Sequence, residues 1–497
     1  MSLRTKRRIA ASLALSLAIP LFAQTALPPA SGLRVVARAD KVSSITQYGI
    51  TWTFDGSYPS GTFVNGDYWV KGPLKIVSIS PQSVIGADGR TMNGSMLNPS
   101  LSLYQGYDSK MFGSTNANAS FNASLNAGRP NGAAISPSNP LVISSPASLV
   151  SGVSYSDLPA DGTANRVHLM AVLTILDAIP PADAFRPPYV GSDKSVRHTL
   201  SEVNASLLPK LAPSANTPAV ADVAARFQKP WIEHMDTWLK DLFIPRDNMP
   251  NYGRDVATYV SEAALMLTLN VDQATKDLLM IRLIQLGLDN YGLVTQPGGN
   301  DTWRADGGHM PGRAFPIILA GHLLGDQGML DVMKKSGQYA YQNGHYEGSL
   351  PSDYVHFGEI DQTFFVTQRD VDRTHGLLGT WEPDSRATAV PYETSDIGMA
   401  EWGSAHAHMP SADNKNWATP YRAVNSPACS GFVLASRILG IADEWNHPPL
   451  FYYISRWMND PAIEAGVDGG VGGRGQTDFE TSMWDAYDAK YPNPPRE

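Results

Sequence analysis

The spacing of apolar residues changes partway along this chain, and that change limits the folds it can adopt. From about residue 32 to 187, apolar and polar residues alternate in short runs such as YGITWTFDGSYPSGTFVNGDYWVKGPLKIVSIS. These runs are rich in Val, Thr, Tyr and Trp and are interrupted by turn-forming segments such as DGSYPSG, which is typical of half-buried strands. We therefore expect an N-terminal β-sandwich over residues 32–200, because many short strands separated by turns close into a sandwich or a barrel.

Helical spacing replaces the alternation after residue 230. Apolar side chains recur at helical intervals in two successive segments, Val256, Val260, Ala263 and Leu267, then Leu278, Ile281, Ile284 and Leu288. This spacing predicts amphipathic helices. Long loops rich in glycine and aromatic residues separate the helical segments, which favours an (α/α) toroid, that is, an incomplete helical barrel, over residues 231–497. Residues 201–230 mix Pro, Ala and Ser without a period and are expected to form a linker in a multidomain α+β chain.

The first 23 residues have the features of a secretory signal peptide. Arg4, Lys6, Arg7 and Arg8 precede an apolar run from Ile9 to Phe22, and small residues follow around Ala23. The run is shorter than the roughly 20 residues of a spanning helix. We expect a secreted or periplasmic protein with no membrane partner.

Charge and cysteine content exclude some classes of partner and of site. Removing the four cations of the signal segment takes the formal net charge from -9 to -13. Nucleic acid is therefore not an expected partner, because phosphate binding relies on basic patches. An acidic polysaccharide would need a locally basic cleft. Cys429 is the single cysteine, which excludes an intramolecular disulfide and a multi-cysteine metal site.

Functional side chains gather where turn-rich segments run into apolar helices. In NDTWRADGGHMPGRAFPIILAGHLLGD, residues 300–326, Trp303, His309 and Arg313 precede such a helix. Asp306 and the glycines around it could simply cap the helix. That interpretation does not explain His309 and Arg313, which are four residues apart and so lie on the same side of a helix start. We favour a functional role, because functional residues concentrate in loops and at helix N-termini.

A second segment of the same kind is NMPNYGRDVA, in which Asn251, Tyr252 and Arg254 precede an apolar helix. Asn251 could cap that helix and Tyr252 could pack. Two such openings favour a shared site, because the starts of successive helical hairpins that run the same way converge on one rim.

A third segment, IGMAEWGSAHAHMPSADNKNWATPYRAVNSPACSGF, has little secondary-structure signal before its helix. It contains Glu401, Trp402, His406, His408, Tyr421, Arg422 and Asn425. Trp402 and Trp417 are suited to stacking against sugar faces.

The pair of histidines in HAH is a weak metal signal. Two histidines at this spacing point the same way in a strand, and Zn would need a third ligand such as Glu401 or His309. A Ca site in the Gly-Asp-rich tail is a further alternative. No metal or other cofactor is the expectation, with a bound Zn or Ca ion kept as the alternative.

Cleavage of a uronic-acid polymer by β-elimination requires the residue types found in these segments. The carboxylate must be neutralised, a base must take the adjacent proton, and an acid must protonate the departing oxygen. Free tyrosine has a pKa of about 10, so a tyrosine base needs neighbouring cations, which arginines provide.

A secreted chain with a helical toroid, a β-sandwich and this set of Asn, His, Tyr and Arg resembles the (α/α)-toroid polysaccharide lyases, among them the alginate lyases and heparinase-like enzymes. The resemblance lies in architecture and residue types over the helical half; in many of those lyases the β domain follows the helices, whereas here it precedes them. It implies a lyase acting on an alginate- or glucuronan-like polysaccharide. It implies Tyr252, His309, His408 and Tyr421 as catalytic residues. It implies substrate contacts from Asn251, Arg254, Trp303, Arg313, Glu401, Trp402, Arg422 and Asn425.

Two alternatives stay open. A glycoside hydrolase on the same toroid would use paired carboxylates roughly 5–9.5 Å apart, with Asp306, Asp361 and Glu401 as candidates. A non-catalytic glycan-binding protein would have no reason to bring Tyr252, His309 and Tyr421 together, whereas an enzyme must.

Overall fold

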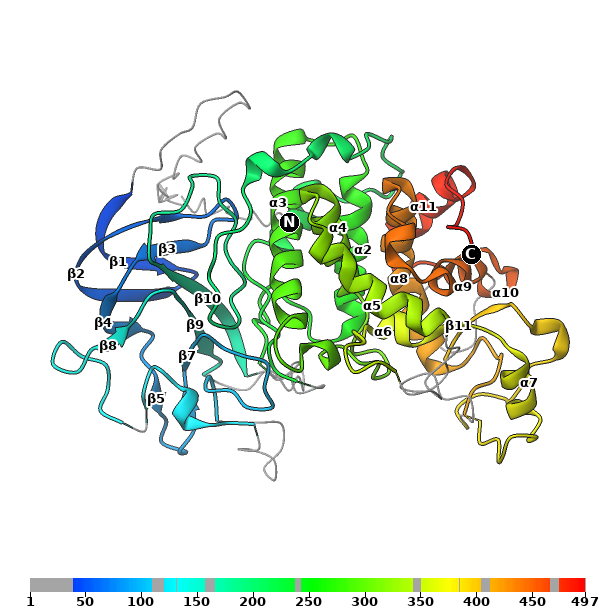
Figure 1. Cartoon of the computed structure of the whole chain (residues 1–497), viewed down its shortest axis with the longest axis horizontal. Coiled ribbons are helices and arrows are strands. Elements are labelled where there is room, and N and C mark those ends of the chain that lie inside the picture. The colour runs from blue at the N-terminus through cyan, green and yellow to red at the C-terminus, as the bar shows by residue number, and fades with distance from the viewer. Residues whose placement is uncertain are drawn as a thin grey trace, which may run out of the picture. The chain divides into compact units, whose positions relative to one another are not determined.

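A curled β-sheet is followed by a helical half (Figure 1). The computed structural model describes residues 39–109, 120–130, 132–156, 166–236, 243–342, 350–383, 385–403, 412–464 and 473–496. The signal segment expected over residues 1–23 lies outside these ranges, as do His406 and His408.

The sheet has eight strands in the order β7-β9-β10-β3-β2-β4-β8, with β1 paired to β2. Its strands are β1 (Asp40–Gln47), β2 (Ile50–Thr62), β3 (Tyr68–Lys71), β4 (Leu74–Ser80), β7 (Ser95–Leu97), β8 (Leu141–Ile143), β9 (Ala147–Ser154) and β10 (Val167–Leu176). All neighbours are antiparallel except β10 and β3, which run parallel. Two two-stranded sheets join β5 (Val84–Ile85) to β6 (Thr91–Met92) and β11 (Thr363–Phe365) to β12 (Ala400–Trp402).

At β9 and β10 both faces of the sheet are buried, and each faces a different core. On β10, Val172 belongs to the core shared with the helices, whereas the next residue, Leu173, belongs to a second core, formed by the strands together with Ile135 from a loop. Alternate residues point to opposite faces of a strand, which accounts for this division. The strand core includes Trp52, Ile76 and Ile143 from other strands of the same sheet. The mixed α+β class is therefore as expected. Among the described strands, one curled sheet encloses this core, whereas in a sandwich a second facing sheet would cover it.

The described residues include eleven α-helices. They are α1 (Val220–Arg226), α2 (Gly253–Leu267), α3 (Gln273–Val294), α4 (Ala314–Leu324), α5 (Gln327–Gln342), α6 (Gly358–Asp361), α7 (Gln368–Thr374), α8 (Pro420–Leu439), α9 (Pro448–Asn459), α10 (Pro461–Glu464) and α11 (Asp478–Tyr487). Local sequence sets several of their ends. Asp272 caps α3 by accepting the N–H of Thr275, and glycines with positive φ end α4 at Gly325 and α8 at Gly440.

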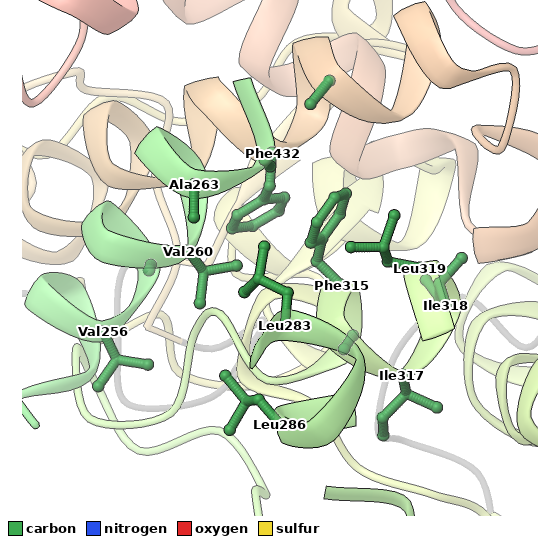
Figure 2. Close-up of a cluster of buried hydrophobic side chains, with 14 of the residues drawn as sticks. Val256, Val260, Ala263, Leu283, Leu286, Phe315, Ile317, Ile318, Leu319 and Phe432 are labelled. Carbon is green, nitrogen blue, oxygen red and sulfur yellow. The ribbon is translucent and has the colours of Figure 1, made fainter. Parts of the chain in front are cut away.

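Four helices share one apolar core, which Figure 2 shows in close-up. Val260 and Ala263 come from α2, Leu283 from α3, Phe315 from α4 and Phe432 from α8. The Phe315 and Phe432 rings stack with centroids 6.2 Å apart. Because α2 packs on α8 and α3 on α4, the starts of these helices are positioned by a rigid core.

Residues 201–230 pack as part of the structure. Leu208, Val223 and Phe227 are buried in the core shared by the sheet and the helices. From residue 39 onward the chain forms one compact unit. These residues, expected to form a linker, therefore contribute side chains to that core.

A fully buried ion triad joins the sheet to α3. The guanidinium of Arg186 donates to Asp67, in the turn between β2 and β3, at 2.6 Å and to Asp289 of α3 at 2.5 Å. Gln47 of β1 also donates to Asp67, at 2.9 Å. Every charge in the triad has a partner, as burial requires.

No helix in the described ranges is long and apolar enough to cross a membrane.

Candidate functional site

The turn Gly307–Gly308–His309 lies where the N-terminal ends of three helices meet. The backbone N–H of Arg254, at the start of α2, donates to the carbonyl of Gly308 at 2.9 Å. Asn425, in the second turn of α8, donates from Nδ2 to the carbonyl of Gly307 at 3.0 Å. The same segment continues through Arg313 into α4. The convergence expected from the three segments is therefore present.

Tyr252 and His309 are in direct contact. Tyr252 immediately precedes α2 in an extended conformation, and its ring meets that of His309 edge to face with centroids 4.8 Å apart. The tyrosine hydroxyl lies against Gly308, where a Cβ atom would be only 2.1 Å from it. Only glycine leaves room for the hydroxyl at this position.

Tyr421 reaches the same turn from α8. A Cβ atom on Gly307 would lie 2.7 Å from the tyrosine ring and 3.0 Å from its hydroxyl oxygen, and Gly307 has a φ of +57°. Tyr421 and Asn425 are four residues apart and so lie on one face of α8. Tyr252, His309 and Tyr421, predicted from three separate segments, therefore meet at the turn formed by residues 307–309.

A guanidinium covers the ring of each tyrosine. The Cζ atom of Arg254 lies 5.5 Å from the centroid of Tyr252, and that of Arg386 lies 5.1 Å from the centroid of Tyr421. Arg254 also donates to Asp255 at 2.7 Å, and this hydrogen bond raises its pKa above the ordinary value. The N-terminal ends of α2, α4 and α8 add the positive ends of their dipoles. The turn therefore has two guanidinium groups and three helix N-termini around it, with the charge of Arg254 partly offset by Asp255.

Sequence reasoning missed Arg386. It is exposed in the segment between α7 and β12, where an isolated arginine resembles any surface residue. The need for a cation beside each tyrosine is the only signal that could have found it.

Arg313 and Asn425 hold the turn from the interior. The guanidinium of Arg313 pairs with Glu233 at 2.5 Å and donates to the carbonyls of His309 and Pro311, with a side-chain exposure of 2%. Asn425 is fully buried. Gln362, a second buried amide, donates to the Gly307 carbonyl at 3.2 Å. These contacts position the turn, and burial keeps Arg313 and Asn425 away from a ligand outside it.

Glu401 and Arg422 form a buried pair behind the same helix start. The Glu401 carboxylate lies between Arg422 at 2.6 Å and Arg456 at 2.7 Å. Arg422 also donates to the carbonyl of Trp402 at 2.8 Å. Neither member of the central pair has exposed side-chain surface. The sequence predicted both as substrate contacts, whereas the structure places them in the support beneath α8.

The tryptophans predicted as stacking surfaces pack in the interior. Trp303 stacks on Phe357 with centroids 5.7 Å apart, and Trp402 packs on Tyr453 at 5.7 Å. Both tryptophans are completely buried. Trp417 is half-buried beneath the guanidinium of Arg456. A large aromatic side chain before an apolar helix gains more from burial than from exposure, which explains the difference.

Asn251 is half-buried beside Tyr252, which is consistent with its predicted place at the rim. His408 lies outside the described residues, so its predicted role has no structural counterpart here.

The carboxylates of the hydrolase alternative are mostly enclosed. Asp361 accepts hydrogen bonds from His356 at 2.9 Å, from Tyr354 at 3.2 Å and from the backbone of Ala305 at 3.0 Å, and its side chain is not exposed. Glu401 is held between two arginines. Asp306 alone among the three is partly exposed.

Glu359 is a buried carboxyl that sequence reasoning missed. One oxygen accepts the N–H groups of Gly312 at 3.2 Å and Ala314 at 3.4 Å, at the start of α4. The other oxygen is buried without a hydrogen-bond partner. Desolvation raises the pKa of Glu359 from its ordinary 4.5 to about 7. Glu359 therefore takes up a proton on folding in weakly acidic solution.

Substituting Glu359 with glutamine is expected to change how stability depends on pH. Because the folded-state pKa is raised, the wild-type protein binds a proton between about pH 4.5 and 7 that the unfolded chain does not, and its stability falls as pH rises through that window. Relative to Glu359→Gln, the wild type should lose up to about 3 kcal/mol between pH 5 and 8. Urea unfolding at several pH values measures this difference. The exposed Glu382→Gln serves as the control and should track the wild type; a wild-type curve parallel to that of Glu359→Gln would contradict the assignment.

No group of three or more His, Cys, Asp or Glu side chains arranged to hold a metal ion occurs among the described residues. The HAH pair and part of the Gly-Asp-rich tail, residues 465–472, lie outside them. The alternative of a Zn or Ca ion thus stays a prediction.

Comparisons of this chain with protein-family models, with curated proteins and with solved structures give no match.

Proposed function

We propose that this protein is a secreted polysaccharide lyase that cleaves a uronic-acid-containing polymer, alginate-like or glucuronan-like, by β-elimination. The observation that carries the proposal is the meeting of Tyr252, His309 and Tyr421 on one glycine turn, with an arginine over each tyrosine ring. These are the groups that the reaction needs, and they come from three distant segments of the chain.

The first requirement is neutralisation of the substrate carboxylate. Arg254, Arg386 and the N-terminal ends of the three helices supply positive charge around the turn. With its charge offset, the carboxylate withdraws electrons from the neighbouring carbon and makes that C–H more acidic. This local positive charge also offsets the repulsion expected between an acidic protein and an acidic polymer.

The second requirement is proton transfer. One tyrosine takes the proton next to the carboxylate, the electron pair of that C–H bond forms the new double bond, and the glycosidic C–O bond breaks. The other tyrosine gives its proton to the departing oxygen. His309, which packs against Tyr252, acts as the partner base of Tyr252. A guanidinium covers the ring of each tyrosine and places positive charge beside it.

The hydrolase alternative is less well supported. An acid and base pair must reach the scissile bond, and the Asp361 and Glu401 side chains are both enclosed and fully engaged by neighbouring groups. Of the three carboxylates predicted for a hydrolase, Asp306 is then the one whose side chain could reach a substrate.

The finer architecture belongs to the same proposal. The packing of α2 with α8 and of α3 with α4 supports an incomplete (α/α) toroid, and the core enclosed by the curled sheet supports a sandwich-like first half.

Incubation of the purified protein with alginate, glucuronan, heparan, pectate and neutral glucans tests the proposal, with and without EDTA. Ultraviolet absorbance follows the conjugated double bond made by elimination, and a reducing-end assay follows every cleavage. Absorbance rising with reducing ends on one uronate is the expected result. Reducing ends without absorbance would favour the hydrolase, and no cleavage of any polymer would favour the binding protein.

Replacing Arg254 or Arg386 with glutamine should weaken binding of the substrate carboxylate. Each variant is expected to lower kcat/KM about tenfold, chiefly through KM, because a partly exposed charge contributes less than a buried one. The loss should shrink as ionic strength rises, since salt screens exposed charges. Steady-state kinetics at low and high salt measure both effects, with Arg197→Gln, an exposed arginine paired with Asp193, as the control. Equal kcat/KM for wild type and both variants would remove these arginines from the site.

A further inference from the structure

A hollow lies between the sheet and α3, apart from the turn that carries the tyrosines. Its cavity volume is about 370 Å³, within the roughly 300–1,000 Å³ of small-molecule pockets. The turn between β1 and β2, the start of β3 and the middle of α3 line it. It shares no lining residue with the proposed lyase site.

Arg282 of α3 supplies a cation to this cavity. Its Nη1 donates to the carbonyl of Ala224 at 2.6 Å, and within the described residues it makes no ion pair with a carboxylate. Burial lowers its pKa below the ordinary value. The nearby carboxylates of Asp67 and Asp289 are already paired with Arg186. A desolvated guanidinium held only by a backbone carbonyl is suited to an anionic ligand group.

Gln47 forms part of the cavity wall, and the orientation of its amide is fixed. Its Nε2 donates to Asp67 at 2.9 Å and also to the carbonyl of Gly66. The amide cannot be reversed, because its oxygen would then face the carboxylate. Its Oε1 is buried and has no hydrogen-bond partner. This oxygen has almost no accessible surface, so Gln47 contributes to the cavity wall and not to a ligand contact.

Two tyrosines complete the lining. Tyr48 is held at a φ of 50° and donates from its hydroxyl to the carbonyl of Gln228 at 2.8 Å. Tyr68, at the start of β3, is half-buried on the same cavity. Aromatic rings beside amide groups form the kind of surface on which the C–H face of a sugar stacks.

We propose that this cavity binds a sugar that carries a carboxylate. Arg282 pairs with the carboxylate, and Tyr48 and Tyr68 contact the ring. The proposal goes beyond the lyase assignment, since it requires no cleavage.

Isothermal titration calorimetry with glucuronate, glucose and acetate tests this proposal on the full chain. Saturable binding of glucuronate is expected, with weaker binding of the neutral sugar and of the bare carboxylate. Arg282→Met, which keeps the aliphatic stem, should weaken glucuronate binding about tenfold or more. Tyr68→Leu should weaken it as well and serves as the second variant if Arg282→Met unfolds, with urea unfolding as the check. Tyr252→Phe should bind glucuronate as tightly as the wild type.

Absence of saturable glucuronate binding, equal binding by wild type and both cavity variants, or acetate binding as tight as glucuronate would overturn the proposal. A loss of binding in Tyr252→Phe that the cavity variants do not share would place the sugar at the turn instead and would also overturn it. None of these readouts depends on turnover, so failure of the lyase assay leaves the test intact.

Discussion

Replacing either Tyr252 or Tyr421 with phenylalanine should lower kcat by about 10²- to 10⁴-fold on the polymer that the protein cleaves, the range of general acid–base catalysis. The change removes one hydroxyl oxygen and keeps the ring, so the contacts with Gly308 and Gly307 lose little packing. KM should change less than kcat, because the proton moves only in the transition state. His309→Ala should also abolish most of the turnover, since it removes the ring packed on Tyr252.

Tyr259 offers a matched control for these variants. It lies on α2, as Tyr252 lies at the start of that helix, and the Cζ atom of Arg226 covers its ring at 4.3 Å. Tyr259→Phe therefore removes a tyrosine hydroxyl from a similar pair at another place and should leave kcat unchanged. Full activity in Tyr252→Phe, Tyr421→Phe and His309→Ala would rule out the proposed site, and an equal loss in Tyr259→Phe would point to folding rather than chemistry.

Arg186→Met should destabilise the protein by about 3–5 kcal/mol, the largest effect we expect on folding. The variant leaves the carboxylates of Asp67 and Asp289 buried without their shared cation. The loss of free energy of unfolding should shrink at acid pH, because burial raises the pKa of Asp289 and its carboxyl can then be protonated. Urea unfolding at neutral and acid pH measures both results.

The exposed pair Arg197–Asp193 is the control for the triad, with an Arg197 side-chain exposure of 65%. Arg197→Met should cost no more than about 1 kcal/mol. Adding Asp67→Asn and Asp289→Asn to Arg186→Met should recover part of the lost stability, because the penalty arises from unpaired charge. A triad variant as stable as Arg197→Met would show that the triad does not hold the sheet to α3.

The division into strands and helices could be predicted because the period of the apolar residues reports local structure. What covers each face of the β-sheet could not be predicted. Val172 and Leu173 are both fully buried, and nothing in their alternation says that helices cover one and the curled sheet the other. Residues 201–230 lack a period but still place Leu208 and Phe227 in the core, because short irregular segments can pack without a repeat.

The candidate site was predictable where helix starts define it. Tyr252, His309 and Tyr421 each precede or open an apolar helix, so convergence followed from helices that run the same way. Sequence could not separate a side chain that faces a ligand from one that supports it. Trp402 carries the same local signal whether it stacks on a sugar or fills the core, and partners such as Arg386 come from segments with no signal of their own.

Cleavage by elimination at the tyrosine turn can be distinguished from hydrolysis by the products formed in heavy-oxygen water. The measurement is the mass of the oligosaccharides released from the cleaved uronate polymer, together with their ultraviolet absorbance. Elimination adds no water, so we expect products with an unsaturated end and without heavy oxygen at the new reducing end. Tyr252→Phe should release neither these products nor their absorbance. Heavy oxygen at the new reducing end, in products that lack an unsaturated end, would rule out elimination and show that the protein hydrolyses its substrate.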